Sequence, residues 1–288
     1  TKLKFPAAML GVLLLLFHIS YVIEGVRSAL TVCAVSIIPS LFVFMIAADL
    51  TVTLTAGDTC GIPPKYAVFL LGALCGFPMG AVACERMTAS GALSKEDAAR
   101  LLPFVNNASP AFIVGAVGNM LGDRRLGILI CVSQIAASLL FLLPLRVKRR
   151  AAAPSVAQAP ITDAFFTAVD GAVRSILRIS ALICLFSAIL AVLRHYVRAP
   201  FLYAALAALL EIGSGTSFCA LLFQSAPPVA VALCAFACGW SGICVHFQIF
   251  SSLKSVKVNR FHFLLCKVAQ GLITTFFTSI GCKFLFGY

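Results

Sequence analysis

Nine long apolar stretches constrain this chain more than any other feature of its sequence. They cover residues 5–23, 29–52, 66–84, 101–122, 126–145, 174–193, 200–222, 227–250 and 262–285. A helix that crosses a bilayer needs about 20 mostly apolar residues, and each stretch is close to that length. Charged residues make up only 11% of the chain and hydrophobic residues 61%, whereas globular domains have about 25% and about 45–50%. The sequence therefore predicts an all-α polytopic membrane protein whose main partner is the lipid bilayer.

The net charge of +12 does not indicate nucleic-acid binding, because the basic residues form no basic face or polar domain. In a membrane protein, basic residues in the loops instead set the orientation of the spans. Most of the 12 cysteines lie in apolar stretches, where a free cysteine behaves as a small hydrophobe. Cys234 and Cys238 have no His or acidic neighbour at zinc-ligand spacing, so we expect no metal site and no cofactor.

A basic segment divides the chain into two halves. Residues 146–161 begin with Arg146-Val-Lys-Arg-Arg150 and continue as an Ala/Pro linker. We expect an N-terminal membrane helix over 1–27, a first repeat over 28–145, and a second repeat over 162–288. At a constant offset, Gly76 aligns with Gly239, and each half then has an apolar segment interrupted by small residues. Paired interruptions of this kind indicate the binding site of a transporter.

The distribution of Lys and Arg favours re-entrant hairpins at both interrupted segments. With hairpins, most basic residues fall on the side of the N-terminus, whereas full crossings divide them almost evenly. Positive charge gathers in cytoplasmic loops. We therefore expect residues 85–100, 146–161 and 253–260 to face the cytoplasm, and the repeats to run parallel.

Two polar clusters lie within apolar stretches, where polar groups are costly. Asn106, Asn107 and Ser109 precede Pro110, which removes a backbone donor. The cluster predicts a discontinuous helix whose amides contact substrate, or else a kink whose amides bond neighbouring helices. The second cluster contains Glu211, which is predicted to bind a coupling ion or proton, or else to lie in a loop.

The other predicted substrate-binding residues lie beside Glu211, in the interrupted segments or in the last apolar stretch. Glycines at an interruption allow close backbone approach, and a half-helix N-terminus offers N–H groups to an anion. We expect Ser214 and the tips of the two interrupted segments to converge near mid-membrane with Glu211, the asparagines and Ser109. Gln270 can instead form an interhelical hydrogen bond. The additional residues are Gly76, Pro78, Gly80, Ser214, Thr216, Gly239, Ser241, Gly242 and Gln270.

These motifs resemble a known family. The order Gly76-Phe-Pro-Met-Gly80, Gly91-Ala-Leu-Ser, Asn106-Asn-Ala-Ser-Pro110 and Glu211-Ile-Gly-Ser-Gly215 is similar to that of sporulation integral membrane proteins with a nucleoside-recognition, or Gate, domain. The resemblance covers residues from about 28 to the end. It implies a two-repeat fold similar to concentrative nucleoside transporters, with hairpins and discontinuous helices, in a bacterial cell or forespore membrane. It also implies transport of dipicolinate or a similar small anion, with nucleosides a less favoured substrate.

The sequence thus predicts a transporter or permease for a small, polar, anionic metabolite, which is not an enzyme and which can form a homo-oligomer. Two alternatives remain open. One is a membrane scaffold of a sporulation-type assembly that transports nothing. The other is an intramembrane serine protease in which Ser241 attacks and His262 acts as base.

Overall fold

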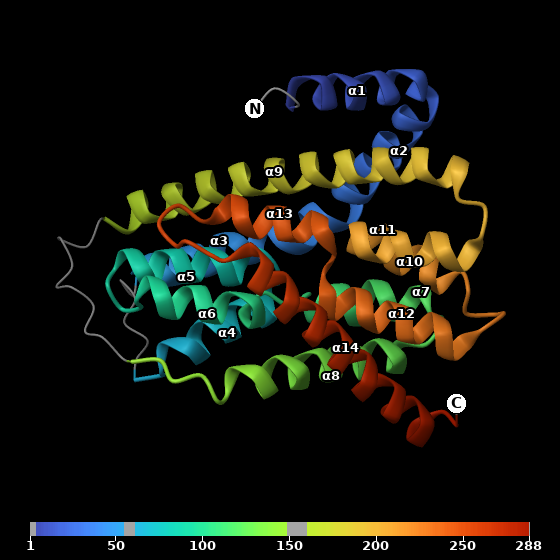
Figure 1. Ribbon diagram of the computed structural model, residues 1–288. Helices are drawn as coiled ribbons and strands as arrows, with labels where there is room; N and C mark the ends of the chain where they lie inside the picture. The colour runs from blue at the N-terminus through green and yellow to red at the C-terminus, as the bar shows by residue number, and fades with distance from the viewer. Residues whose placement is uncertain (1–3, 55–60, 149–159, 288) are drawn as a thin grey trace.

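Helices alone make up the regular structure of the described residues, which are 4–54, 61–148 and 160–287 in this computed structural model (Figure 1). Most of the predicted linker lies outside the described residues. Four helices are long and apolar enough to span a membrane, and a bent pair would make a fifth. The four are Arg124–Leu142, Ile161–Tyr196, Pro227–Ser252 and Arg260–Leu285. The chain is therefore consistent with a multi-pass membrane protein, although it has fewer uninterrupted spans than the nine predicted.

The N-terminal region is not the single helix predicted over 1–27. It forms α1 (Lys4–Phe17) and α2 (Ile19–Val32), and the chain bends by 89° between them. From α2 the chain continues through the π-helix η1 (Cys33–Ile37) into α3 (Ile38–Leu54). This continuous stretch packs along α9 (Ile161–Tyr196) (Figure 1).

Two helix pairs turn back on themselves. The first pair is α4 (Pro64–Cys75) and α5 (Met79–Ala89), and the second is α10 (Pro200–Leu210) and α11 (Ile212–Ala220). The two helices of the first pair are in close contact: a Cβ added at Gly72 would lie 3.1 Å from the Gly80 Cα. The prediction that 200–222 is one crossing is therefore wrong, since the backbone is extended at Glu211 and reverses there.

Two other elements are interrupted without reversing. One runs from α6 (Lys95–Val105) through extended residues 106–109 into η2 (Ala111–Val117) and α7 (Gly118–Met120). The other runs from α12 (Pro227–Trp240) into α13 (Gly242–Ser252), and together these helices have the length of a span. The predicted hairpin at 239–242 is therefore wrong. Two residues with positive φ, Ser241 and Gly242, interrupt the helix and do not turn the chain back.

The remaining long helices, α8 (Arg124–Leu142) and α14 (Arg260–Leu285), pack against the interrupted elements (Figure 1). The turns after α5 and α13 and the residues that flank 149–159 lie at one end of the molecule, here called the linker end. Hydrogen bonds connect them: the Ser255 N–H donates to Glu85, and Lys65 Nζ donates to the carbonyl of Leu145. Segments 85–100 and 253–260 therefore lie at the same end of the molecule. Residues 200–222, predicted as one crossing, form a hairpin, and residues 227–250, predicted as a hairpin, run on in one direction. These two changes cancel, so the relative position of the two segments is the predicted one.

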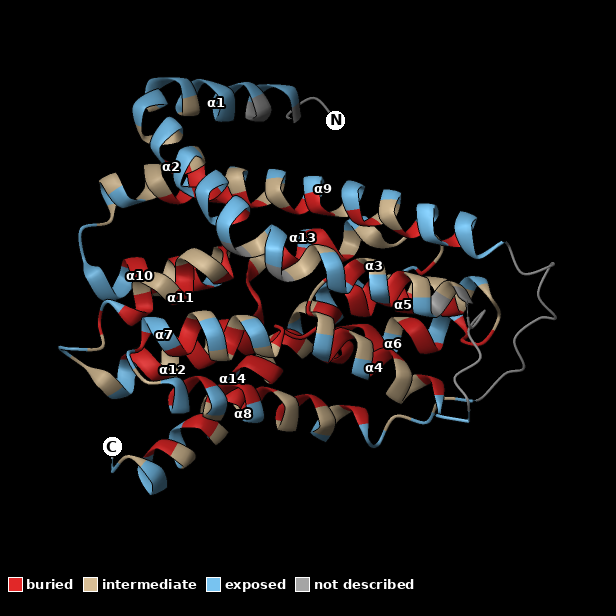
Figure 2. Cartoon of the chain, turned by 180° about the vertical axis from the view of Figure 1, so that it is seen from behind, coloured by how far each residue is buried: buried red, intermediate tan, exposed pale blue. Residues whose placement is uncertain are grey.

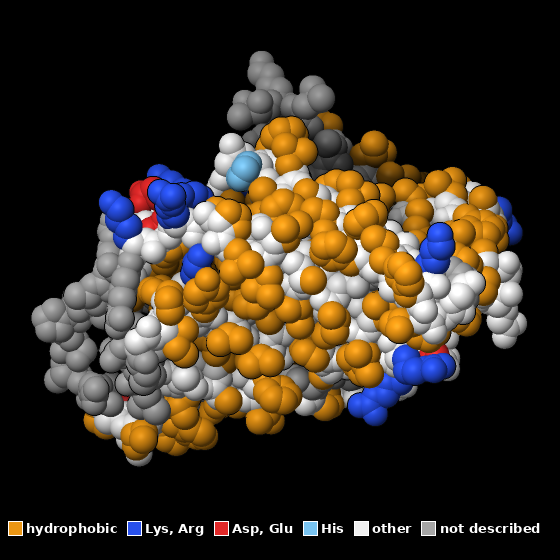
Figure 3. Space-filling model, turned by 90° about the horizontal axis from the view of Figure 1, so that it is seen from below, with side chains coloured by type: hydrophobic (Ala, Val, Ile, Leu, Met, Phe, Trp, Pro, Cys, Tyr) orange, Lys and Arg blue, Asp and Glu red, His pale blue; other side chains and the backbone are white. Residues whose placement is uncertain are grey.

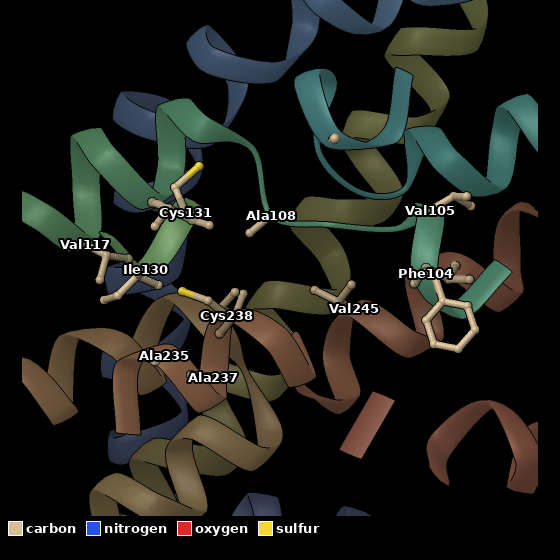
Figure 4. Close-up of a cluster of buried hydrophobic side chains, with 14 of the residues drawn as sticks. Phe104, Val105, Ala108, Val117, Ile130, Cys131, Ala235, Ala237, Cys238 and Val245 are labelled. Carbon is tan, nitrogen blue, oxygen red and sulfur yellow. The ribbon is translucent and has the colours of Figure 1, made fainter. Parts of the chain in front are cut away.

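The core lies where the interrupted elements meet α8 and α14, and the outer faces are exposed and apolar (Figure 2). In the close-up of Figure 4, Ile130 and Cys131 of α8 face Ala235 and Cys238 of α12. Most described cysteines are buried and none of the described ones forms a disulfide, as expected for small hydrophobes. Hydrophobic side chains cover most of the face seen in Figure 3, and most of its Lys and Arg gather near the two ends.

Candidate functional site

A small cavity of about 60 Å³ lies at the centre of the molecule, and we call it the central cavity. The first hairpin contributes Gly76 to its wall, the α6–η2 interruption contributes Ser109, and the second hairpin contributes Glu211. From α13 come Val245 and Gln248. The structure thus brings together three of the predicted site residues from distant parts of the sequence.

Glu211 is buried, with 4% of its surface exposed, and it caps α11. Its Oε1 accepts a hydrogen bond of 2.8 Å from the Gly213 N–H, and its Oε2 accepts one of 2.6 Å from the Ser214 N–H. A carboxylate is favoured there by the orphan N–H groups and by the helix dipole. The N-terminus of α11, which is not one of the half-helix N-termini predicted to bind an anion, is thus bonded to a carboxylate of the chain itself.

The first hairpin fits against the end of α6 through its glycines. A Cβ added at Gly72 would lie 1.7 Å from the Val105 carbonyl oxygen, and one at Gly80 would lie 2.2 Å from it. At the tip, Gly76 has φ +80°, a conformation that disfavours any other residue. Pro78 follows a cis peptide bond and is buried. These residues set the distance between the hairpin and the interruption.

Asn106 and Asn107 are fully buried and satisfy the backbone around the first interruption. Asn106 Nδ2 donates to the carbonyl of Leu102, and Asn107 Nδ2 donates to that of Phe104. Asn106 Oδ1 accepts from the Ala81 N–H of the first hairpin. Neither side chain lines the central cavity, so their contact with substrate stays a prediction.

Polar side chains from α8 and α14 complete this network, and sequence analysis missed most of them. Lys267 Nζ donates to the Asn106 carbonyl (3.2 Å) and to Gln270 Oε1 (2.7 Å). Gln270 Nε2 donates to Asn107 Oδ1 and lies 2.6 Å from Ser138 Oγ. From α8, Gln134 Nε2 donates to the carbonyl of Ala108. A lysine and a glutamine three residues apart in an otherwise apolar stretch were the available signal.

The second interruption is supported differently. The Trp240 carbonyl accepts from His246 Nε2 at 2.8 Å, and Trp240 Nε1 donates to the carbonyl of Leu209 at the second hairpin. Ser241 Oγ donates to the Cys238 carbonyl at 3.4 Å, whereas His262 is exposed at the start of α14. Ser241 and His262 therefore do not form the pair that the protease hypothesis needs.

The other predicted residues are separated from the central cavity. Gly239 packs against α14, since a Cβ there would lie 2.8 Å from the Gly271 Cα. Gly242 has φ +79° and lies against the second hairpin tip. Thr216 donates only to carbonyls of its own helix. Ser214 lines a different cavity, at the end opposite to the linker.

Two larger cavities lie on either side of the central one. The linker-end vestibule, of about 550 Å³, lies between α3, α5, α9 and α13. The opposite vestibule, of about 530 Å³, lies between α2, α9, α10 and α11. Because α9 lines all three cavities, through Ser175, Ile179, Ile183 and Ser187, the cavities form a row along this helix.

Apolar side chains separate the three cavities. One buried cluster contains Met45, Met79 and Ile176 on the linker side, and it continues to Cys33 and Phe186 on the other side. We call these two groups the linker-side seal and the opposite seal. The central cavity lies between these two groups.

The linker-end vestibule is basic. Its lining includes Arg174, Arg178 and Lys254. Its two carboxylates are already bonded: Asp49 pairs with Arg86 at 2.5 Å, and Glu85 accepts from backbone N–H groups of the 253–259 loop. Burial opposes ionisation of Glu85, but the hydrogen bonds from residues 254–256 outweigh it and hold the pKa of this carboxyl below its ordinary value.

The basic side chains of the linker-end vestibule can attract an anion. The described residues contain no group of His, Cys, Asp and Glu side chains able to hold a metal ion. Comparison of the chain with protein-family models, with curated proteins and with solved structures gave no match.

Proposed function

We propose that this chain is a membrane transporter for a small, polar, anionic metabolite, which it moves without chemical conversion. The row of three cavities carries the proposal. Two vestibules at opposite ends, each separated from a small central cavity by buried apolar side chains, have the arrangement that alternating access requires. A scaffold that only packs against partners has no need of such a row.

The order of the elements supports a fold of two repeats in inverted orientation. In the first half, α2–α3 is followed by a hairpin at the linker end, an interrupted crossing, and α8. In the second half, α9 is followed by a hairpin at the opposite end, an interrupted crossing, and α14. On this proposal, the hairpins are re-entrant and the repeats are inverted, whereas the charge distribution had led us to expect parallel repeats. This fold would be similar to that of concentrative nucleoside transporters.

The charges of the vestibules favour an anionic substrate. Arg174 and Lys254 line the linker-end vestibule, and Arg194 and Arg198 line the opposite one, where Glu24 is the sole carboxylate among the described lining residues. A basic cavity raises the local concentration of anions. With the family resemblance, this favours dipicolinate or a similar dicarboxylate in a bacterial cell or forespore membrane. The linker end is then cytoplasmic.

Glu211 is the residue through which we propose ion coupling. Its carboxylate is the one acidic group that lines the central cavity among the described residues. An anion that enters the cavity would be repelled unless a proton or cation neutralises this charge. Coupling to a proton or cation would therefore lower the cost of loading the substrate.

The test is uptake of labelled dipicolinate, with a nucleoside for comparison, into liposomes that contain the purified protein. We expect the wild type to accumulate dipicolinate when a proton or Na⁺ gradient is imposed. We expect Glu211→Gln, which removes the charge that the coupling ion neutralises, to lose this accumulation. The matched control is Glu96→Gln, because Glu96 is exposed on α6 and lines none of the three cavities. Folding of each variant is checked by thermal unfolding in detergent.

Two results would contradict the proposal. Gradient-driven accumulation that survives in well-folded Glu211→Gln would exclude Glu211 as the coupling residue. Folded wild-type protein that moves neither dipicolinate nor a wider panel of small anions would favour the scaffold.

A further inference from the structure

Lys267 is a fully buried basic residue in a helix long enough to span the membrane. The three ion pairs among the described residues do not include it, so no described carboxylate lies within ion-pair distance. A charge at membrane depth is costly unless other groups compensate it. The compensating groups must therefore be the oxygens that it contacts.

Those oxygens belong to the first interruption and its support. Lys267 Nζ lies 3.2 Å from the carbonyl oxygen of Asn106, which is the C-terminal cap of α6. It lies 2.7 Å from Oε1 of Gln270, one turn further along α14. The carbonyl end of a helix carries partial negative charge and attracts cations. In discontinuous membrane helices, such free carbonyl ends are where coupling cations such as Na⁺ bind.

We propose that the Lys267 ammonium is a built-in cation that occupies this carbonyl site in place of a diffusible monovalent ion. Lys267 is on this proposal a positioning residue. It fixes the extended segment 106–109 to α14, and through Ser109 it fixes one wall of the central cavity. Transport therefore requires no inorganic cation at this interruption. A coupling ion would bind instead in the central cavity, at Glu211. The transport part of this inference rests on the proposed function, whereas the cation site does not.

The experiment replaces the ammonium with one from solution. Lys267→Ala removes the side chain and leaves the Asn106 carbonyl and Gln270 Oε1 around an empty space of the size of a small ammonium ion. Methylammonium and Na⁺ can enter that space, whereas choline is too large. We expect the melting temperature of Lys267→Ala to rise by several degrees in methylammonium or sodium chloride relative to choline chloride at equal ionic strength.

Three further proteins complete the design. The wild type and Lys283→Ala, an exposed lysine of the same helix, are expected to melt equally in all three salts. Lys267→Met fills the space without a charge, so we expect it to fold, to lose at least about tenfold in uptake, and to gain nothing from methylammonium. This variant carries the test if Lys267→Ala does not fold.

The inference is overturned if Lys267→Ala melts alike in the three salts, or if Lys267→Met transports as the wild type does. If the wild type itself transports nothing, the proposed function fails. The cation site is still decided in that case, because the salt-dependent melting needs no transport.

Discussion

The two interrupted crossings solve one problem, a break in a helix within apolar surroundings, in different ways. At the first, four residues leave the helix, and two of their backbone carbonyls accept from side chains of α8 and α14. At the second, the break is Ser241 and Gly242, both with positive φ, and the adjacent Trp240 carbonyl accepts from His246 of α13. The long break therefore takes its donors from neighbouring helices, whereas the short break takes its donor from the helix that follows it.

The two hairpins that face the interruptions also differ, in where the capping group at the tip comes from. The tip of the first hairpin receives its acceptor from outside, since Ala81 donates to Asn106 Oδ1. The second hairpin is capped by its own Glu211. The helix after the first hairpin tip is thus capped from outside the hairpin, and the helix after the second tip from within it. On the proposed two-repeat fold, similar shapes are therefore reached with different residues, which accounts for the weak sequence similarity of the halves.

The largest expected effect comes from separating the first hairpin from its interruption. Gly72→Ala places a Cβ 1.7 Å from the Val105 carbonyl oxygen, a backbone atom that cannot move aside easily. We expect a loss of about 3 kcal/mol or more in unfolding free energy, because overpacking is costly in a tight contact. Gly115→Ala is the control, because a Cβ there meets nothing within 4 Å. A Gly72→Ala protein that melts like the wild type would show that the hairpin is loosely held.

The next effect tests the side-chain support of the first interruption. Gln270→Leu removes one of the two donors to Asn107 Oδ1 and one acceptor of Lys267. We expect it to cost about 2–3 kcal/mol, because buried polar groups lose their partners. In the same helix, Thr275→Val removes a hydroxyl that donates to Gly271 and should cost about 1 kcal/mol or less. Equal melting temperatures for the two variants would mean that the network adds little to stability.

At the second interruption, we expect a substitution to raise the stability of the protein rather than lower it. Ser241 has φ +75°, which a residue with a Cβ adopts at a cost of about 1–2 kcal/mol. Glycine avoids this cost, but part of the gain is lost because glycine also has more conformational freedom in the unfolded chain. We expect Ser241→Gly to stabilise the protein by about 0.5 kcal/mol and Ser241→Ala not to. A destabilised Ser241→Gly would indicate that the hydroxyl supports the short break after all.

The smallest effect concerns the attachment of the first hairpin to the 253–259 loop. Because the pKa of Glu85 lies below its ordinary value of 4.5 when folded, its contribution is fully present above pH 4.5. That contribution is lost as pH falls through the folded pKa. Glu85→Gln should therefore lower stability at neutral pH slightly and flatten its decline in acid, measured by melting from pH 7 to 3. Parallel profiles for variant and wild type would exclude the ionised carboxylate as the attachment.

Sequence reasoning located the interruptions better than the path of the chain through them. Gly76, Asn106–Pro110, Glu211 and Ser241 lie at helix breaks because glycine, proline and capping side chains act locally. Whether the chain turns back depends on backbone angles and on packing against distant helices. The sequence analysis therefore predicted a hairpin at Ser241, whereas the chain turns back at Glu211. Lys267 was missed because its reason for burial, a carbonyl 161 residues away, is not visible along the sequence.

The 36 residues of α9 correspond to about 54 Å of helix, far more than the roughly 30 Å of hydrocarbon in a bilayer. Part of α9 must therefore project into the headgroups or the water, or the helix must tilt. Since this one helix lines all three cavities, the positions of the other elements can be measured relative to it. Spin labels placed along α9 should keep constant separations during the proposed transport cycle, and motion of either hairpin tip can be measured against them.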